Sequence, residues 1–144
     1  MKKMNNLLKK AIVFTMIFTL SVVGLSFSKA YAATDEISLY DVTENKTIDA
    51  GAGFVVKRLV IKIKVKNIDF KKKVTVHWTD NFSSEWKDTE AEYAYSLGNG
   101  YEVWTADIVY YGAYVEYALK YDVAGQEYWD NNFGENYKAT KYKY

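Results

Sequence analysis

The sequence predicts an all-β domain in which about seven or eight antiparallel strands form a two-layer β-sandwich. In several segments, apolar and polar residues alternate with a period of two, which is typical of strands with one buried face. Polar turn signals separate these segments about every ten to fifteen residues, and no segment after residue 32 shows a sustained helical period. Together these observations favour two packed antiparallel sheets.

The first clear strand spans residues 58–66, where every second side chain is aliphatic and lysines fill most positions between them. A second strand over 73–79 points Trp78 inward and His77 outward, where no partner for the imidazole is evident. A polar loop over 80–90 is expected to follow.

Three further strands complete the pattern. A short strand over 91–97 ends at the turn signal Gly98-Asn99-Gly100, and Tyr101 opens the next strand, in which Trp104 lies on the inward face. The segment 114–123 alternates throughout, and Ala124-Gly125 turns the chain into 126–129. Tyr128 and Trp129 are adjacent there, so their side chains must point to opposite faces of the sheet.

The first 32 residues are typical of an export signal. A basic start precedes an apolar stretch from Ala11 to Phe27 and the small-residue site Ala30-Tyr31-Ala32. Cleavage after Ala32 would leave one secreted domain, residues 33–144, that stands alone. The competing interpretation is an uncleaved membrane anchor, because about 17 apolar residues lie at the lower limit for spanning a bilayer. Both interpretations place the domain outside the cytoplasm.

The composition excludes several classes of function. The chain has no cysteine and a single histidine, so disulfides, thiol nucleophiles and multi-histidine zinc sites are excluded. Residues 33–144 contain 14 basic and 18 acidic residues, a net charge of −4, which disfavours nucleic-acid binding. A sandwich of this size also offers no evident cleft for the paired carboxylates of a glycosidase. We therefore expect no enzyme activity, no metal and no cofactor.

Aromatic residues are the abundant feature of residues 33–144, with 4 Trp, 13 Tyr and 4 Phe. This number exceeds what one small core usually absorbs. Some rings should therefore be exposed, and exposed rings often mark binding surfaces.

Two separated motifs narrow the prediction. Residues 128–137 read Tyr-Trp-Asp-Asn-Asn-Phe-Gly-Glu-Asn-Tyr, and residues 65–76 read Val-Lys-Asn-Ile-Asp-Phe-Lys-Lys-Lys-Val-Thr-Val. With shorter matches at 101–105 and 116–121, they resemble carbohydrate-binding module family 21, the starch- and glycogen-binding type. The resemblance covers about residues 59–139. It implies an immunoglobulin-like β-sandwich that binds α-glucans without catalysis, on aromatic rings at two surface sites.

The resemblance places the first site at Trp129 and at an aromatic residue in the loop that follows the second strand. Phe82 matches the spacing of the family, whereas Trp86 supplies the larger ring. We favour Trp86 and keep Phe82 as the alternative. A third aromatic position of the fungal version falls at Ala118, which carries no ring.

The second site falls on four aromatic positions, with Tyr95 as the alternative if the loop is out of register: Phe70, Tyr93, Tyr101 and Tyr128. Flat rings stack on the apolar C–H faces of glucose, while amides and charges bind its hydroxyl groups. Asn131, Asn132 and Lys72 are the polar candidates. The two asparagines are equally typical of a turn that holds itself together through side-chain to backbone bonds.

Two functions remain open from the sequence. The first is an exported α-glucan-binding protein that carries no enzyme of its own and acts beside a separate amylase or at the cell surface. The second is an extracellular protein-interaction or cell-surface domain that has lost sugar binding. Soluble starch or β-cyclodextrin should quench tryptophan emission only under the first.

Overall fold

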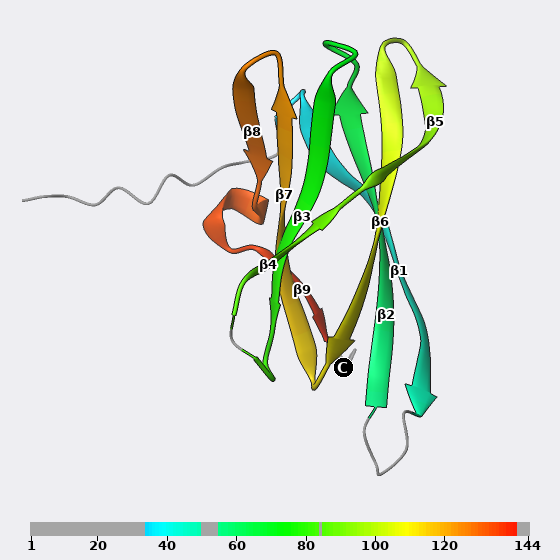
Figure 1. Ribbon diagram of the computed structural model, residues 1–144, viewed down its shortest axis with the longest axis vertical. Coiled ribbons are helices and arrows are strands. Elements are labelled where there is room, and N and C mark those ends of the chain that lie inside the picture. The colour runs from blue at the N-terminus through cyan, green and yellow to red at the C-terminus, as the bar shows by residue number, and fades with distance from the viewer. Residues whose placement is uncertain (1–33, 50–54, 84, 141–144) are drawn as a thin grey trace, which may run out of the picture.

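The computed structural model describes residues 34–49, 55–83 and 85–140 (Figure 1). These residues form nine strands, and every strand pair is antiparallel. The elements are β1 (Ile37–Asp49), β2 (Val55–Lys66), β3 (Lys72–Asp80), β4 (Lys87–Glu90), β5 (Glu92–Gly98), β6 (Tyr101–Tyr111), β7 (Tyr114–Val123), β8 (Gln126–Asp130), the 3-10 turn η1 (Asn132–Gly134) and β9 (Tyr137–Thr140). Within these ranges, no helix has the length and apolar character that crossing a bilayer requires. The expected export signal over residues 1–32 lies outside the described residues.

The strands form two sheets, which confirms the predicted β-sandwich. One sheet has the order β1-β2-β6-β5, and the other has the order β4-β3-β7-β8. β9 also pairs with β7, so that β8 and β9 occupy successive halves of the same β7 edge. η1 lies where the chain passes from β8 to β9 (Figure 1).

β4 and β5 follow each other closely and carry the chain from one sheet to the other (Figure 1). Ala91 lies between them, is buried, and its N–H donates a 2.8 Å hydrogen bond to the carbonyl oxygen of Val74. The sequence predicted a loop over 80–90, but Lys87–Glu90 pairs with β3. β4 is an exposed edge strand defined by backbone pairing, so it lacks the apolar alternation that marks the other strands.

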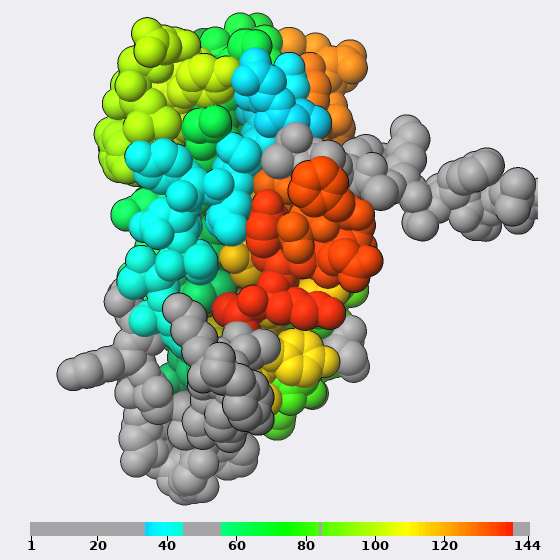
Figure 2. Space-filling model, turned by 180° about the vertical axis from the view of Figure 1, so that it is seen from behind, coloured from blue at the N-terminus to red at the C-terminus, as the bar shows by residue number. Residues whose placement is uncertain are grey.

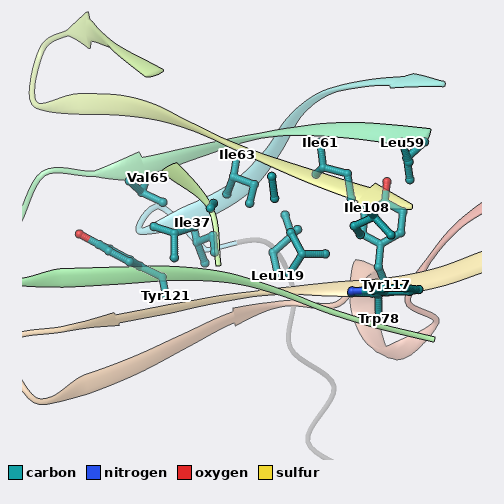
Figure 3. Packing of buried hydrophobic residues seen from close by; sticks show 14 of the residues in the cluster. Ile37, Leu59, Ile61, Ile63, Val65, Trp78, Ile108, Tyr117, Leu119 and Tyr121 are labelled. Atoms are coloured by element: carbon teal, nitrogen blue, oxygen red, sulfur yellow. The ribbon is translucent and has the colours of Figure 1, made fainter. Parts of the chain in front are cut away.

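The core lies between the sheets, where the alternation predicted it (Figure 3). The inward apolar side chains of β2 from residue 59 onward and of β7 are at most 3% exposed: Leu59, Ile61, Ile63, Val65, Val115, Tyr117, Leu119, Tyr121 and Val123. Full burial of an aliphatic side chain contributes about 1.5–3 kcal/mol. Trp78 is 7% exposed, as predicted. Trp104 is only partly buried and packs against the edge of this cluster.

Candidate functional site

Three aromatic rings meet on the outer face of the β4-β3-β7-β8 sheet. The imidazole of His77 on β3 stacks on Trp86, with ring centroids 4.6 Å apart and an interplanar angle of 10°. The same imidazole makes an edge contact with Trp129 on β8, at 5.9 Å and 87°. The two indole planes are therefore nearly perpendicular. We call Trp86, His77 and Trp129 the tryptophan corner.

Charged groups orient the Trp129 side of the corner. The indole N–H of Trp129 donates a 2.6 Å hydrogen bond to Glu127 Oε1, and the ammonium of Lys120 lies 5.7 Å from the centre of a Trp129 ring. Lys120 also forms an ion pair of 2.9 Å with Glu127. Hydrogen bonds from Trp129 and Lys120 hold the pKa of Glu127 below its ordinary value, so this carboxylate stays ionised and fixes the indole.

His77 has partners that the sequence did not indicate. Its Nδ1 lies 2.6 Å from Asp88 Oδ1, and its ring stacks on Trp86, so the expectation of an imidazole without a partner is wrong. The pairing of His77 with Asp88 depends on β4, which the sequence predicted as loop. Only the pairing register of β3 with β4 brings Asp88 opposite His77, and the alternation of residues within one strand carries no information about that register.

Phe82 lies apart from the tryptophan corner. Its ring is 71% exposed, and its aromatic neighbour is Tyr111, with centroids 6.1 Å apart. Backbone N–H groups of Phe82 and Ser83 donate to Asp80 Oδ1 at 3.1 and 2.8 Å. These bonds fix the start of the β3–β4 connection. The structure thus brings Trp86, rather than Phe82, beside His77 and Trp129.

The four rings predicted for the second site are dispersed. Phe70 is fully exposed in the β2–β3 connection, and Tyr93 on β5 is 54% exposed and contacts Trp104 edge-on at 6.0 Å. The hydroxyl of Tyr101 donates a 2.6 Å hydrogen bond to Asp35. Tyr128 packs toward the core, 6.2 Å from Tyr121. Within the described residues, no ring contact joins any two of these four side chains.

Phe70 and Tyr101 nevertheless belong to one end of the sandwich. The N–H of Asn67, in the β2–β3 connection, donates a 2.7 Å hydrogen bond to the carbonyl oxygen of Gly100 in the β5–β6 turn. Tyr95 on β5, the alternative to the predicted set, is 43% exposed.

Lys72, a predicted sugar contact, is engaged inside the protein. Its side chain is 5% exposed and forms a 2.9 Å ion pair with Glu102 of the opposite sheet. Its ammonium also donates to the side chain of Asn67. Glu102 accepts a 3.0 Å hydrogen bond from the indole N–H of Trp104 as well. The geometry assigns Lys72 to a link between the two sheets.

The Asp-Asn-Asn motif is built into a turn. The amide oxygen of Asn131 accepts from the N–H of Gly134 at 3.0 Å, and the amide nitrogen of Asn132 donates to the carbonyl oxygen of Asn136 at 3.2 Å. Asn132 has a φ of 51°, which asparagine tolerates better than most residues, and Phe133 follows it with a φ of 60°. Of the two interpretations of these asparagines, the observed contacts match the self-supporting turn.

Asp130 is the buried centre of the motif, with 0% exposure. Its carboxylate accepts hydrogen bonds from the Tyr137 hydroxyl at 2.8 Å and from the Leu39 N–H at 3.0 Å. Figure 2 shows the orange and red C-terminal segments packed beside the cyan β1. Burial and the hydrogen bond to Asp130 raise the pKa of Tyr137. Asp130 therefore joins β8 and β9 to β1. Trp129, the residue before it, belongs to the tryptophan corner.

The sequence profile of carbohydrate/starch-binding module family 21 matches residues 55–140. The chain therefore belongs to this family, as its two motifs predicted. Glucoamylase 1 of Rhizopus oryzae is 38% identical over 86 residues, which are 57% of this chain and 14% of that protein. Glycogen-binding subunit 76A of Drosophila melanogaster is 29% identical over 80 residues, which are 52% of this chain and 12% of that protein. The similarity thus concerns a small part of each relative.

Solved structures share the same fold. The starch binding domain of Rhizopus oryzae glucoamylase, in complex with β-cyclodextrin and maltoheptaose, has a TM-score of 0.59 and 26% identity, covering 75% of this chain and 95% of that one. The carbohydrate binding module of the muscle glycogen-targeting subunit of Protein Phosphatase-1 has a TM-score of 0.51 and 21% identity, covering 74% of this chain and 76% of that one. The second likeness concerns the fold alone.

Proposed function

We propose that this protein is a secreted, non-catalytic α-glucan-binding protein whose principal binding surface is the tryptophan corner. One observation carries the proposal: two indoles that are distant in the sequence are held against one imidazole on an open sheet face. Trp86 is 44% exposed, and His77 covers one face of its ring. We expect the exposed part of the indole to stack on the apolar C–H face of a glucose unit.

The class of ligand follows from the family and from the chemistry of the surface. The related starch binding domain was solved with two α-glucans, β-cyclodextrin and maltoheptaose. Perpendicular indoles suit a curved chain better than a flat one, because each ring stacks on a glucose unit of different orientation. Glu127 and Lys120 lie beside Trp129 and offer an acceptor and donors for hydroxyl groups. Starch and glycogen supply curved α-linked chains.

A second, weaker surface is proposed from Phe70, Tyr93 and Tyr101. Phe70 and Tyr93 are exposed and Tyr101 is half-buried, and the three rings are separate, so each offers one stacking contact. Tyr128 packs toward the core, and contributes to this surface only through its exposed part. A polymer that reaches both surfaces gains from effective concentration, so insoluble starch should bind more tightly than a short oligosaccharide.

Secretion and partners are proposed from the sequence. Residues 1–32 have the three-part pattern of an export signal, and the glucan-binding surface would then act outside the cytoplasm. In that setting the protein would hold an α-glucan for a separate amylase or at a cell surface.

Sedimentation with insoluble polysaccharide tests the proposed function. The protein is mixed with granular starch and, in parallel, with cellulose, and β-cyclodextrin is added as a competitor. We expect binding to starch alone and release by β-cyclodextrin. Failure to bind either polymer would overturn the proposal, and the protein-interaction alternative would replace it.

A further inference from the structure

We propose that His77 contacts the ligand: its Nε2 hydrogen-bonds a hydroxyl group of the glucose unit held in the tryptophan corner. This inference rests on the proposed function, and it adds a polar contact on the His77 side of the tryptophan corner to those offered by Glu127 and Lys120 beside Trp129. It starts from an unusual placement. The single histidine of the chain lies between the two tryptophans and contacts both.

Asp88 determines which nitrogen is available. Asp88 Oδ1 lies 2.6 Å from Nδ1, and an ionised carboxylate only accepts hydrogen bonds, so Nδ1 carries the proton. In the neutral ring Nε2 is then the acceptor. Among the residues that the structure describes, Nε2 has no hydrogen-bond partner, although the side chain is 34% exposed. A hydroxyl group from a ligand would satisfy it.

Nε2 lies on the β7 side of the imidazole. The two nitrogens of an imidazole point in nearly opposite directions, so Nε2 points away from Asp88 and β4. On that side His77 pairs with Ala118 of β7, and Lys120 on the same strand pairs with Trp129 of β8. Ala118 is 4% exposed, so neighbouring side chains already cover it, and a ligand would reach Nε2 through the exposed part of the His77 side chain. The imidazole therefore supplies a ring next to the position where the resemblance expects an aromatic residue.

The charged groups around His77 already have partners. On β7, Lys120 pairs with Glu127 of β8 at 2.9 Å, and Glu116 accepts from Asn136 at 2.7 Å. On β4, Asp88 is bonded to His77 itself. Among the described groups around His77, Nε2 is thus an acceptor with no hydrogen-bond donor. A sugar hydroxyl group is a donor of suitable size that also accompanies a stacked ring.

Nitrogen NMR of the imidazole tests this directly, because the protein has one histidine and its ring signals cannot be confused. In the neutral ring, Nδ1 should carry the proton and Nε2 should not. Adding maltoheptaose should shift the Nε2 resonance, whereas cellohexaose should not. An unmoved Nε2 resonance with shifted tryptophan signals would overturn the role of His77 and leave the proposed function standing. No shift of any signal at saturating maltoheptaose would overturn both.

Two variants give an independent measurement. His77→Phe keeps a flat ring for Trp86 but removes both nitrogens, and it should weaken maltoheptaose binding about three- to tenfold, the effect of losing one hydrogen bond. Lys73→Ala is the control on the same face of β3 and should bind like the unaltered protein. Equal affinity of His77→Phe and the unaltered protein would overturn the contact. If His77→Phe does not fold, the NMR titration of the unaltered protein decides.

Discussion

Leu39 and Asp130 are 91 residues apart in the sequence and are joined by a hydrogen bond of 3.0 Å from the Leu39 N–H to the Asp130 carboxylate. This bond connects β1 to the end of β8 across the two sheets. The same carboxylate accepts from the Tyr137 hydroxyl and from the Asn132 N–H. Asp130, the acidic residue of the Asp-Asn-Asn motif, therefore stabilises the fold. Its neighbour in the sequence, Trp129, belongs to the tryptophan corner.

Asp130→Ala should destabilise the fold without removing the ring of Trp129. It leaves the Leu39 N–H and the Tyr137 hydroxyl without their shared acceptor, and an unsatisfied buried polar group costs about 1–3 kcal/mol. We expect a loss of about 3 kcal/mol in the free energy of unfolding, measured by urea denaturation. Glu135→Ala, at an exposed position in the same turn, is the control. A change below about 0.5 kcal/mol would show that the motif is not held by Asp130.

The loop partner of Trp129 is decided by comparing two variants. Trp86→Ala should abolish most of the binding to granular starch, because it removes one side of the tryptophan corner. Phe82→Ala should have little effect, since the ring of Phe82 lies beside Tyr111. Depletion of each variant by starch, with circular dichroism as the check on folding, gives the comparison. If Phe82→Ala weakened starch binding more than Trp86→Ala, Phe82 would be the loop partner of Trp129.

Local alternation predicted the core because it records which side of one strand is buried. Ile61 and Leu119 lie in different sheets, yet each was placed inward from its own neighbours alone. Contacts between distant segments could not be predicted in this way. Lys72 looked like an exposed basic residue, but its partner Glu102 is 30 residues away. His77 was interpreted as a surface residue because the strand that carries Asp88 was assigned to a loop.

The family resemblance predicted some contacts between distant segments that the alternation of residues could not predict. It predicted that Trp129 has a partner in the loop after β3, and the structure places both Trp86 and Trp129 in contact with His77. Asn131 and Asn132 are candidates both for polar contacts and for a self-supporting turn, and their amides bind backbone atoms of that turn. A shared motif does not separate residues kept for folding from residues kept for binding, because both occupy the same short segment.

Acid should unfold the protein partly through Asp80. Burial of this carboxyl raises its pKa, but hydrogen bonds from the backbone N–H groups of Ser83, Tyr111 and Phe82 outweigh burial, so the pKa lies below the ordinary value of 3.8. Because the pKa is lower in the folded state, the stabilisation is present above that ordinary value and is lost as the pH falls through the folded-state pKa.

The corresponding variant is Asp80→Asn. We expect it to be less stable than the unaltered protein at neutral pH, and to lose less stability between about pH 5 and pH 2. Urea midpoints measured across this range give both quantities. Parallel pH profiles for the two proteins would show that Asp80 is not responsible for the loss in acid.

Alkaline pH should unfold the protein through its buried tyrosines. Burial raises the pKa of Tyr117, and burial also raises the pKa of Tyr121 to about 12. A tyrosine whose pKa is higher in the folded state contributes stability that is complete below its ordinary value of 10.0, and this stability is lost as the pH rises toward the folded-state pKa. Titration of tyrosinate absorbance should therefore show a late class of buried rings, including Tyr117 and Tyr121, that ionise together with unfolding. Tyr121→Phe loses the 2.7 Å hydrogen bond from the hydroxyl to the carbonyl oxygen of Lys66, but it should keep the fold at neutral pH. In the titration, this variant should have one tyrosine fewer in the late class. A single titration step, complete before the circular dichroism signal changes, would contradict the burial of these hydroxyl groups.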